Sequence, residues 1–126
     1  FGNTLVTKTL TGKQIIGILE QQLNNPDWYR ILSPSSGFRF GYDLSRPIGQ
    51  RVVFATLNGT PLGENQTYRV AVSDFLSNGG DGFSLFKEGA NPAVGPTDLE
   101  ALMAWLSRGE TTALPTLDRI ENKTQQ

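Results

Sequence analysis

The chain has 126 residues, which predicts a single domain with a core large enough to be stable without disulfides. Its 11 basic and 12 acidic residues nearly cancel, so no field of one sign favours nucleic acid or an anionic membrane. The sequence has no cysteine and no histidine, which excludes thiolate chemistry, imidazole base catalysis and zinc sites of the usual ligand set within this chain.

Membrane insertion is also not expected. No apolar run approaches the roughly 20 residues that cross a bilayer, and no charged-then-apolar leader opens the chain. We therefore expect neither nucleic acid nor a membrane among its partners. The chain starts at Phe1 without a methionine and passes at once into a strand-like segment, so we expect a cut N-terminus rather than a native one.

The first predicted elements are a strand over Thr4 to Leu10 and a helix that begins at Thr11. Thr11 and Gln14 form a capping box, in which each side chain can satisfy an otherwise unpaired backbone N–H. The polar residues 20 to 22 fall largely outside the buried stripe of this helix, and Pro26 stops it. The stripe consists of four residues at helical spacing: Ile15, Ile16, Leu19 and Leu23.

The middle of the chain predicts antiparallel strands. Aromatic residues alternate with small or polar ones from Gly37 to Tyr42, which places Phe38, Phe40 and Tyr42 on one face of a strand. Arg51 to Leu57 is the expected partner strand, and Asn58-Gly59 marks a tight turn with both residues at positive φ. The fold class that follows is α+β, with mixed and largely antiparallel sheets flanked by helices.

Three stretches lack a clear period. We expect Trp28 and Tyr29 to form a flap over the core rather than a surface aromatic platform. Gly and Pro punctuate Ser84 to Pro96, which predicts irregular structure. After a short segment at Asp118 to Ile120 the tail is polar, with no apolar residue to anchor it, and we expect fraying beyond Lys123.

A second helix is predicted to start at a capping box formed by Thr97 and Glu100. It should extend to about Arg108, with Trp105 at the border of its buried stripe. The stripe is made of Leu99, Leu102, Met103 and Leu106.

The candidate site is the loop from Ser73 to Phe83, which follows a strand predicted over Thr67 to Val72. Gly79, Gly80 and Gly82 can adopt positive φ or lie directly against a ligand. Asp81 can offer an acceptor-only carboxylate to a pair of hydroxyls such as those of a ribose. The alternative is a tight turn in which Asp81 bonds its own backbone, and a bare Gly-Gly-Asp-Gly segment favours that turn. Phe75 and Phe83 on either side make a ligand-binding loop only slightly more favoured over that turn.

Several short segments of the chain occur in an order that is more telling than any one of them. They are Phe1 to Asn3, Thr11 to Lys13, Gly37 to Asp43, Arg51 to Val53, Asn58 to Leu62, Thr67 to Val70 and Asp74 to Phe83. The most specific part is the Phe-Leu-x-x-Gly-Gly-Asp-Gly-aromatic loop. This order resembles one family, the C-terminal substrate-binding domain of 5′-nucleotidases, which includes UDP-sugar hydrolases and ecto-5′-nucleotidase. The resemblance covers nearly the whole chain, residues 1 to 126, and implies a layered α/β/β/α domain.

The resemblance implies a binding role for six residues and a catalytic or metal-ligating role for none. Two aromatics clamp the nucleobase in the family, and Phe1 and Phe75 match them. Asn3 matches an asparagine that can bond the base edge, and Asp81 matches the aspartate that holds the ribose hydroxyls. Gly79 and Gly80 belong to the same substrate-binding loop. Stacking on both faces of a base is worth roughly 1 to 3 kcal/mol per base.

The family also predicts what this chain lacks. The phosphate-binding arginine of the family lies upstream of the first clamp aromatic, and this chain begins after it. Bond cleavage belongs to an N-terminal metallophosphoesterase domain that holds two divalent metals. We therefore expect no cofactor in this domain and no enzyme activity from it alone. The resemblance implies that the longer parent chain is a metal-dependent phosphoric monoester hydrolase, periplasmic or secreted, whose partners are a nucleotide or nucleoside and its own N-terminal domain.

Other functions on the same scaffold stay open. One is a 2′,3′-cyclic-nucleotide phosphodiesterase with 3′-nucleotidase activity, and another is a thiosulfohydrolase that needs no base clamp. Phenylalanine at both Phe1 and Phe75 favours the nucleotidase, since cyclic-nucleotide relatives tend towards tyrosine there. The segment from Trp28 to Ser36 departs from the family pattern, with Arg30 near a position usually held by glycine, which leaves the pocket wall and the substrate preference open. An orphan binding module is the third class.

Overall fold

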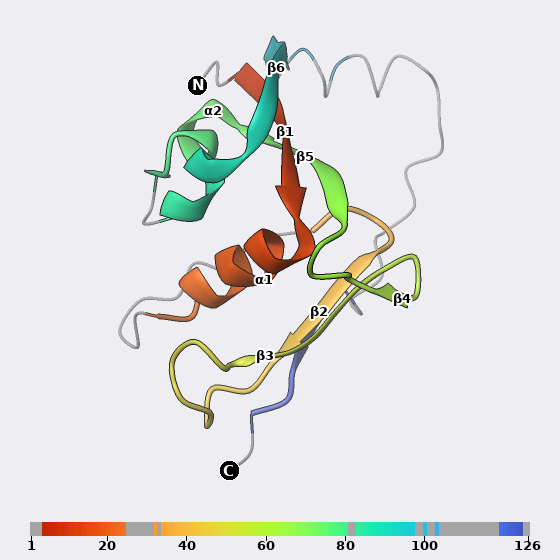
Figure 1. Ribbon diagram of the computed structural model, residues 1–126, viewed down its shortest axis with the longest axis vertical. Coiled ribbons are helices and arrows are strands. Elements are labelled where there is room, and N and C mark those ends of the chain that lie inside the picture. Colours follow the sequence, from red (N-terminus) through yellow and green to blue (C-terminus); the bar gives the residue numbers. More distant parts are fainter. Residues whose placement is uncertain are drawn as a thin grey trace.

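Two β-sheets with helix α1 (Gly12–Gln21) between them make up the fold, as Figure 1 shows. The computed structural model describes residues 4–24, 32, 34–80, 83–97, 100, 103 and 119–124. The strands are β1 (Thr4–Thr11), β2 (Phe38–Tyr42), β3 (Val52–Leu57), β4 (Thr60–Pro61), β5 (Thr67–Ser73), β6 (Ala90–Thr97) and β7 (Ile120–Asn122). Two short helices, α2 (Asp74–Ser77) and the 3₁₀ helix η2 (Ser84–Glu88), follow β5.

The expected α+β class with mixed, largely antiparallel sheets is confirmed. One sheet has the order β5-β1-β6, and β1 is antiparallel to both neighbours. The other has the order β4-β3-β2-β7, in which β7 runs parallel to β2 and the remaining pairs are antiparallel. The predicted tight turn joins β3 to β4, with φ of 52° at Asn58 and 84° at Gly59.

The capping box at the start of α1 is present as predicted. The Gln14 N–H donates to the Thr11 hydroxyl at 3.1 Å, and the Thr11 N–H donates to the Gln14 side-chain oxygen at 2.9 Å. These two bonds satisfy donors that the first turn of a helix leaves unpaired. The direct passage from β1 into α1 therefore follows from a local signal in the sequence.

Helix α1 packs against two separate clusters of buried side chains. Ile18 joins Leu10, Phe83 and Phe86 on the side of the first sheet. Leu19 joins the second cluster, which contains Phe40 and Ala55. The predicted stripe is confirmed: Leu19 and Leu23 are buried, and Ile15 and Ile16 pack against the first and second cluster. Ile18 is buried in addition, because a helix covered on two sides buries a wider arc than a surface helix does.

Gln22 departs from the prediction for the same reason. It was expected outside the buried stripe, yet only 3% of its surface is exposed. Its side-chain oxygen accepts a hydrogen bond from the Leu32 N–H at 2.8 Å. A buried amide that is bonded in this way ties the end of α1 to the chain that leads towards β2.

Glu20 connects α1 to the start of β3. Its two carboxylate oxygens accept the backbone N–H groups of Arg51 at 3.0 Å and Val52 at 2.9 Å. The Arg51 guanidinium in turn donates to the Leu23 carbonyl at the end of the helix, at 2.7 Å. Hydrogen bonds to a charged group contribute more than neutral ones, so this connection is a substantial part of the contact between helix and sheet.

We expect Glu20→Ala to lower the free energy of unfolding by about 2 kcal/mol, because two backbone donors lose a charged acceptor. Glu20→Gln, which keeps one acceptor oxygen, should cost roughly half as much. Urea denaturation of the 126-residue chain measures both values. Glu64→Ala, which removes an exposed carboxylate, is the control. Equal unfolding midpoints for Glu20→Ala and Glu64→Ala would contradict the assignment.

The prediction of irregular structure over residues 84 to 96 was wrong. These residues form η2 and most of β6, which pairs with β1. The register between β1 and β6 shifts twice, between Ala90 and Ala93 and again between Val94 and Thr97. Pro92 and Pro96 fall within these two shifts, where a residue without an N–H interrupts the ladder least. The sequence did not predict this strand, because proline is compatible with a strand only at certain positions of the pairing register. Those positions cannot be recognised from the sequence alone.

The capping box at Thr97 and Glu100 is present. The Glu100 N–H donates to the Thr97 hydroxyl at 3.1 Å, and the Thr97 N–H donates to the Glu100 carboxylate at 3.2 Å. Hydrogen bonds from the Thr97 backbone and hydroxyl hold the pKa of the Glu100 carboxyl below its ordinary value. Met103 was expected in a buried stripe, but 61% of its surface is exposed, so that part of the prediction was wrong. The other predicted stripe residues, Leu99, Leu102 and Leu106, lie outside the described residues. Trp105, Trp28 and Tyr29 lie outside them as well.

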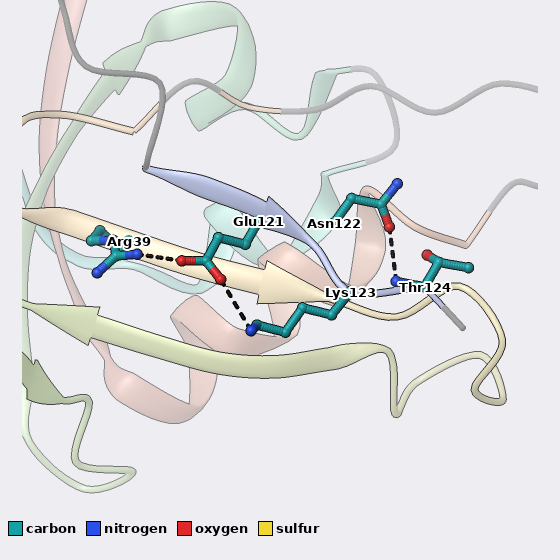
Figure 2. Close-up of polar contacts among 5 residues, drawn as sticks. All are labelled: Arg39, Glu121, Asn122, Lys123 and Thr124. Atoms are coloured by element: carbon teal, nitrogen blue, oxygen red, sulfur yellow. Dashed lines mark hydrogen bonds and ion pairs between the residues drawn. The ribbon is translucent and has the colours of Figure 1, made fainter. Parts of the chain in front are cut away.

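Residues 120–124 are anchored to the second sheet, whereas residues 125 and 126, where fraying was also expected, lie outside the described residues. Strand β7 pairs with β2, and Ile120 packs against the second cluster. Figure 2 shows Glu121 between Arg39 and Lys123, with the Lys123 ammonium 3.1 Å from the carboxylate. The Thr124 hydroxyl accepts the Leu44 N–H at 3.0 Å. Surface ion pairs add little, so the backbone pairing and Ile120 account for most of the anchoring.

Candidate functional site

The candidate site lies where β5 ends and α2 begins. Ser73 caps α2, since its hydroxyl accepts the Leu76 N–H at 3.3 Å. The helix has only four residues and ends at once: the Asn78 N–H donates to Asp74 and the Gly79 N–H to Leu76. The single turn therefore acts as a rigid bend that delivers the glycine loop from the strand.

The bend sends two adjacent apolar side chains in different directions. Leu76 packs against the first cluster, while 50% of the Phe75 surface is exposed. The Asp74 carboxylate accepts the Phe75 N–H at 2.8 Å and so fixes the backbone beneath the ring. A large aromatic side chain held half in solvent on a rigid turn is suited to stacking against a flat ligand.

The two described glycines of the loop are needed for different reasons. Gly79 has a φ of 87°, the left-handed conformation that ends α2. At Gly80 an added Cβ would lie 2.5 Å from the Phe75 ring, so the ring rests directly on the Gly80 backbone. The sequence predicted both uses of glycine, positive φ and close approach, but the group that approaches Gly80 is the ring of Phe75.

Phe83 closes the loop from inside the core. Its N–H donates to the Gly80 carbonyl at 3.1 Å, and only 1% of its surface is exposed. Its ring lies 6.0 Å from that of Phe86, centroid to centroid. The loop thus places one flanking phenylalanine, Phe75, at the surface and the other, Phe83, in the interior.

Phe1, Asn3 and Asp81 lie outside the described residues, so their predicted roles stay predictions. The structure does describe the strand that Phe1 and Asn3 precede. Leu5 pairs with Ser73, which brings the start of β1 beside the end of β5. Figure 1 shows the start of β1 and helix α2 at the same end of the first sheet.

Gln21 supports the far side of the loop and was not recognised as a functional position. Its side-chain nitrogen donates to the Ser84 hydroxyl at 2.9 Å, and its oxygen accepts the Leu85 N–H at 3.2 Å. These contacts cap the start of η2 from helix α1. No local sequence signal could have identified Gln21, because its partners lie 63 and 64 residues away.

An apolar cavity of about 660 Å³ lies elsewhere, between the two clusters. It is lined by residues of both sheets and of α1, including Leu10, Leu19, Phe40, Val70 and Leu76. Phe75, Gly79 and Gly80 are not among its lining residues. The candidate site is therefore separate from this cavity.

The described residues do not fit a metal site. Among them, no group of three Asp or Glu side chains is placed to hold an ion, and the sequence has neither histidine nor cysteine. Within the same ranges, no helix has the length and hydrophobicity needed to cross a bilayer.

Comparison with known proteins identifies the family. The sequence profile described as 5′-nucleotidase, C-terminal domain, matches residues 1–88. The chain is 39% identical over 97 residues to the trifunctional nucleotide phosphoesterase protein YfkN of Bacillus subtilis (strain 168), covering 72% of this chain and 7% of that protein. It is 32% identical over 116 residues to an apyrase of Tabanus yao, covering 82% of this chain and 21% of the apyrase.

A solved structure agrees with these sequence matches. The 5′-nucleotidase precursor from Thermus thermophilus superposes with a TM-score of 0.82 at 38% identity, over 96% of this chain and 25% of that one. The chain therefore spans a quarter or less of each of these three proteins. The profile match over residues 1–88 is the finding that decides the assignment. The chain belongs to the 5′-nucleotidase C-terminal domain family.

Proposed function

We propose that this chain is the nucleotide-recognition domain of a 5′-nucleotidase-type phosphohydrolase. The observation that carries the proposal is the half-exposed Phe75 ring, held on Gly80 beside the start of β1. An aromatic face at this place can stack on a nucleobase without reading its identity. Family membership supports the general role.

The remaining contacts of the proposal come from residues next to this ring in the chain or in the sheet. Phe1 would form the second wall of the base clamp and Asn3 would bond the base edge. Asp81 would accept the two ribose hydroxyls, as a carboxylate can. Base and ribose would then be bound by this chain, and the phosphate would be left for a separate catalytic domain.

We also propose that hydrolysis takes place in an N-terminal metallophosphoesterase domain of the same parent chain. The two divalent metals that the family resemblance implies would be held by that domain. Metal ions in such a pair supply charge stabilisation and an activated water. The substrate would be a nucleotide, and the parent protein would act in the periplasm or outside the cell.

The proposal predicts weak adenosine binding with a Kd of roughly 1 mM, near −4 kcal/mol, and similar binding of AMP. Phe75→Ala should weaken it about 5- to 100-fold, because one face of the base loses its stacking partner. Titration with adenosine, AMP and thiosulfate, followed by NMR chemical shifts, measures these affinities.

Ile48→Ala provides the control for this titration. Ile48 is also an exposed apolar residue, 57% accessible, but it lies in the turn between β2 and β3 of the other sheet. Its removal should leave adenosine binding unchanged. If adenosine shifts no resonance near Phe75, or if thiosulfate alone does, the nucleotide proposal fails and a thiosulfohydrolase-type function takes its place.

A further inference from the structure

Lys8 lies on the face of β1 that carries buried apolar residues, where a lysine is not expected. Side chains alternate along a strand, so Val6, Lys8 and Leu10 share one face. Val6 and Leu10 are buried, with 8% and 1% of their surfaces exposed. Lys8 between them is only partly buried, so its apolar stem can lie along this face while its ammonium reaches polar partners.

The ammonium of Lys8 bonds both ends of the glycine loop. It donates to the Ser77 carbonyl at 2.9 Å and to the Phe86 carbonyl at 3.1 Å. Ser77 is the last residue of α2 and Phe86 lies in η2, so the loop that contains Gly79 and Gly80 runs between the two bonded carbonyls. One cation on the central strand therefore bonds the backbone on both sides of the glycine loop.

The stem of Lys8 is fixed as well. A Cβ added at Gly89 would lie 2.8 Å from the Lys8 Cβ and 2.8 Å from its Cδ, so the chain after η2 rests directly on the stem. The stem is thus bounded by Gly89 on one side, and the ammonium is placed by its two carbonyl partners. The two carbonyls take up two of its three donors.

The loop that Lys8 holds also sets the position of the candidate stacking residue. The Phe75 ring rests on the Gly80 backbone, and Phe83 bonds the Gly80 carbonyl. Gly80 lies three residues after Ser77, so a shift of the Ser77 backbone would move Gly80 and the surface that supports the ring. Lys8 makes no direct contact with that ring among the described contacts, so it would act through the backbone alone.

We propose that Lys8 is a positioning residue for nucleoside recognition: its bonds to Ser77 and Phe86 hold the backbone of α2 and η2 so that Gly80 supports the Phe75 ring. This inference rests on the proposed function. It differs from the family roles considered above, because Lys8 belongs to none of the motifs that carry the resemblance. It also assigns a purpose to a lysine in an otherwise apolar row.

The test compares Lys8→Met and Lys8→Arg in the 126-residue chain. Methionine fills a similar volume without donors, so the adenosine Kd should rise about tenfold, the scale on which residues without ligand contact alter affinity. Arginine keeps donors at the end of a similar stem and should restore binding to within about twofold. Lys13→Met, which removes an exposed lysine from the first turn of α1, should leave binding unchanged.

Amide hydrogen exchange separates positioning from general stability. In Lys8→Met the bonded amides of Asn78, Gly79 and Phe83 should exchange at least about tenfold faster, while those of β2 and β3 stay unchanged. A purely structural role would speed exchange in both sheets and leave the affinity of the folded fraction unchanged, which would overturn the inference. Normal adenosine binding by Lys8→Met would also overturn it. Absence of adenosine binding in the unmodified chain would instead overturn the proposed function. In that case, faster exchange confined to Asn78, Gly79 and Phe83 in Lys8→Met would still show that Lys8 holds this part of the backbone.

Discussion

Replacing Gly12 with alanine should lower the free energy of unfolding by about 3 kcal/mol or more, the upper part of the range for overpacking. An added Cβ would lie 2.0 Å from the carbonyl oxygen of Gly63 and 2.8 Å from its carbonyl carbon. The obstacle is backbone and cannot rotate aside. It is also held against the helix, since Gly12 and Lys13 donate to the carbonyls of Gln66 and Glu64 at 2.9 and 3.2 Å.

Urea denaturation of Gly12→Ala beside Gly95→Ala provides the measurement. At Gly95 the nearest neighbour of an added Cβ is the Leu5 carbonyl oxygen at 3.6 Å, an ordinary contact. That variant should unfold within about 0.5 kcal/mol of the unmodified chain. Equal stabilities for the two variants would mean that the close approach at Gly12 is relieved by a small shift and does not limit the fold.

Replacing Gly80 with alanine should weaken adenosine binding as much as Phe75→Ala does, by about 1 to 3 kcal/mol of binding free energy. The free energy of unfolding should stay nearly unchanged. The added methyl would lie 2.5 Å from the Phe75 ring. Because the ring is half exposed, it can rotate away into solvent at little cost to the fold. The rotated ring would no longer present its face in the position we propose for the base.

Gly59→Ala is the opposite case and serves as the control. Gly59 has a φ of 84° and no neighbour within 4 Å of an added Cβ, in the turn between β3 and β4. Alanine there should cost about 1 kcal/mol of stability through backbone strain, with no loss of adenosine binding. NMR titration and urea denaturation of both variants decide the matter. Unchanged adenosine affinity in Gly80→Ala would show that the ring position does not govern binding.

The features that the sequence predicted well depend on residues close together in the chain. The capping boxes at Thr11 and Thr97 each need only a partner three residues away, and the Asn58-Gly59 turn needs only its own backbone conformations. Periodicity likewise predicted β1, β2, β3 and β5 from their own side chains. Such signals can be recognised without knowledge of the tertiary structure.

The features that escaped prediction depend on partners distant in sequence. Pro92 and Pro96 are compatible with a strand only at the register that β1 imposes. Phe75 and Phe83 flank the same loop, yet packing against Phe86 buries one and the bend of α2 exposes the other. Of the candidate site, the backbone requirement at Gly79 and Gly80 could be predicted, whereas the support from Gln21 could not.

The position of β1 at the centre of its sheet has a consequence for how the chain folds. β1 is the first described strand, but its two neighbours, β5 and β6, follow only after the whole second sheet except β7. Even the side-chain bonds of Lys8 span 69 and 78 residues. Closing loops of that length costs entropy before any contact compensates for it, which makes such topologies slow to fold. During synthesis, β1 and the apolar face of α1 are made well before β5 and β6, the two strands that complete the first sheet.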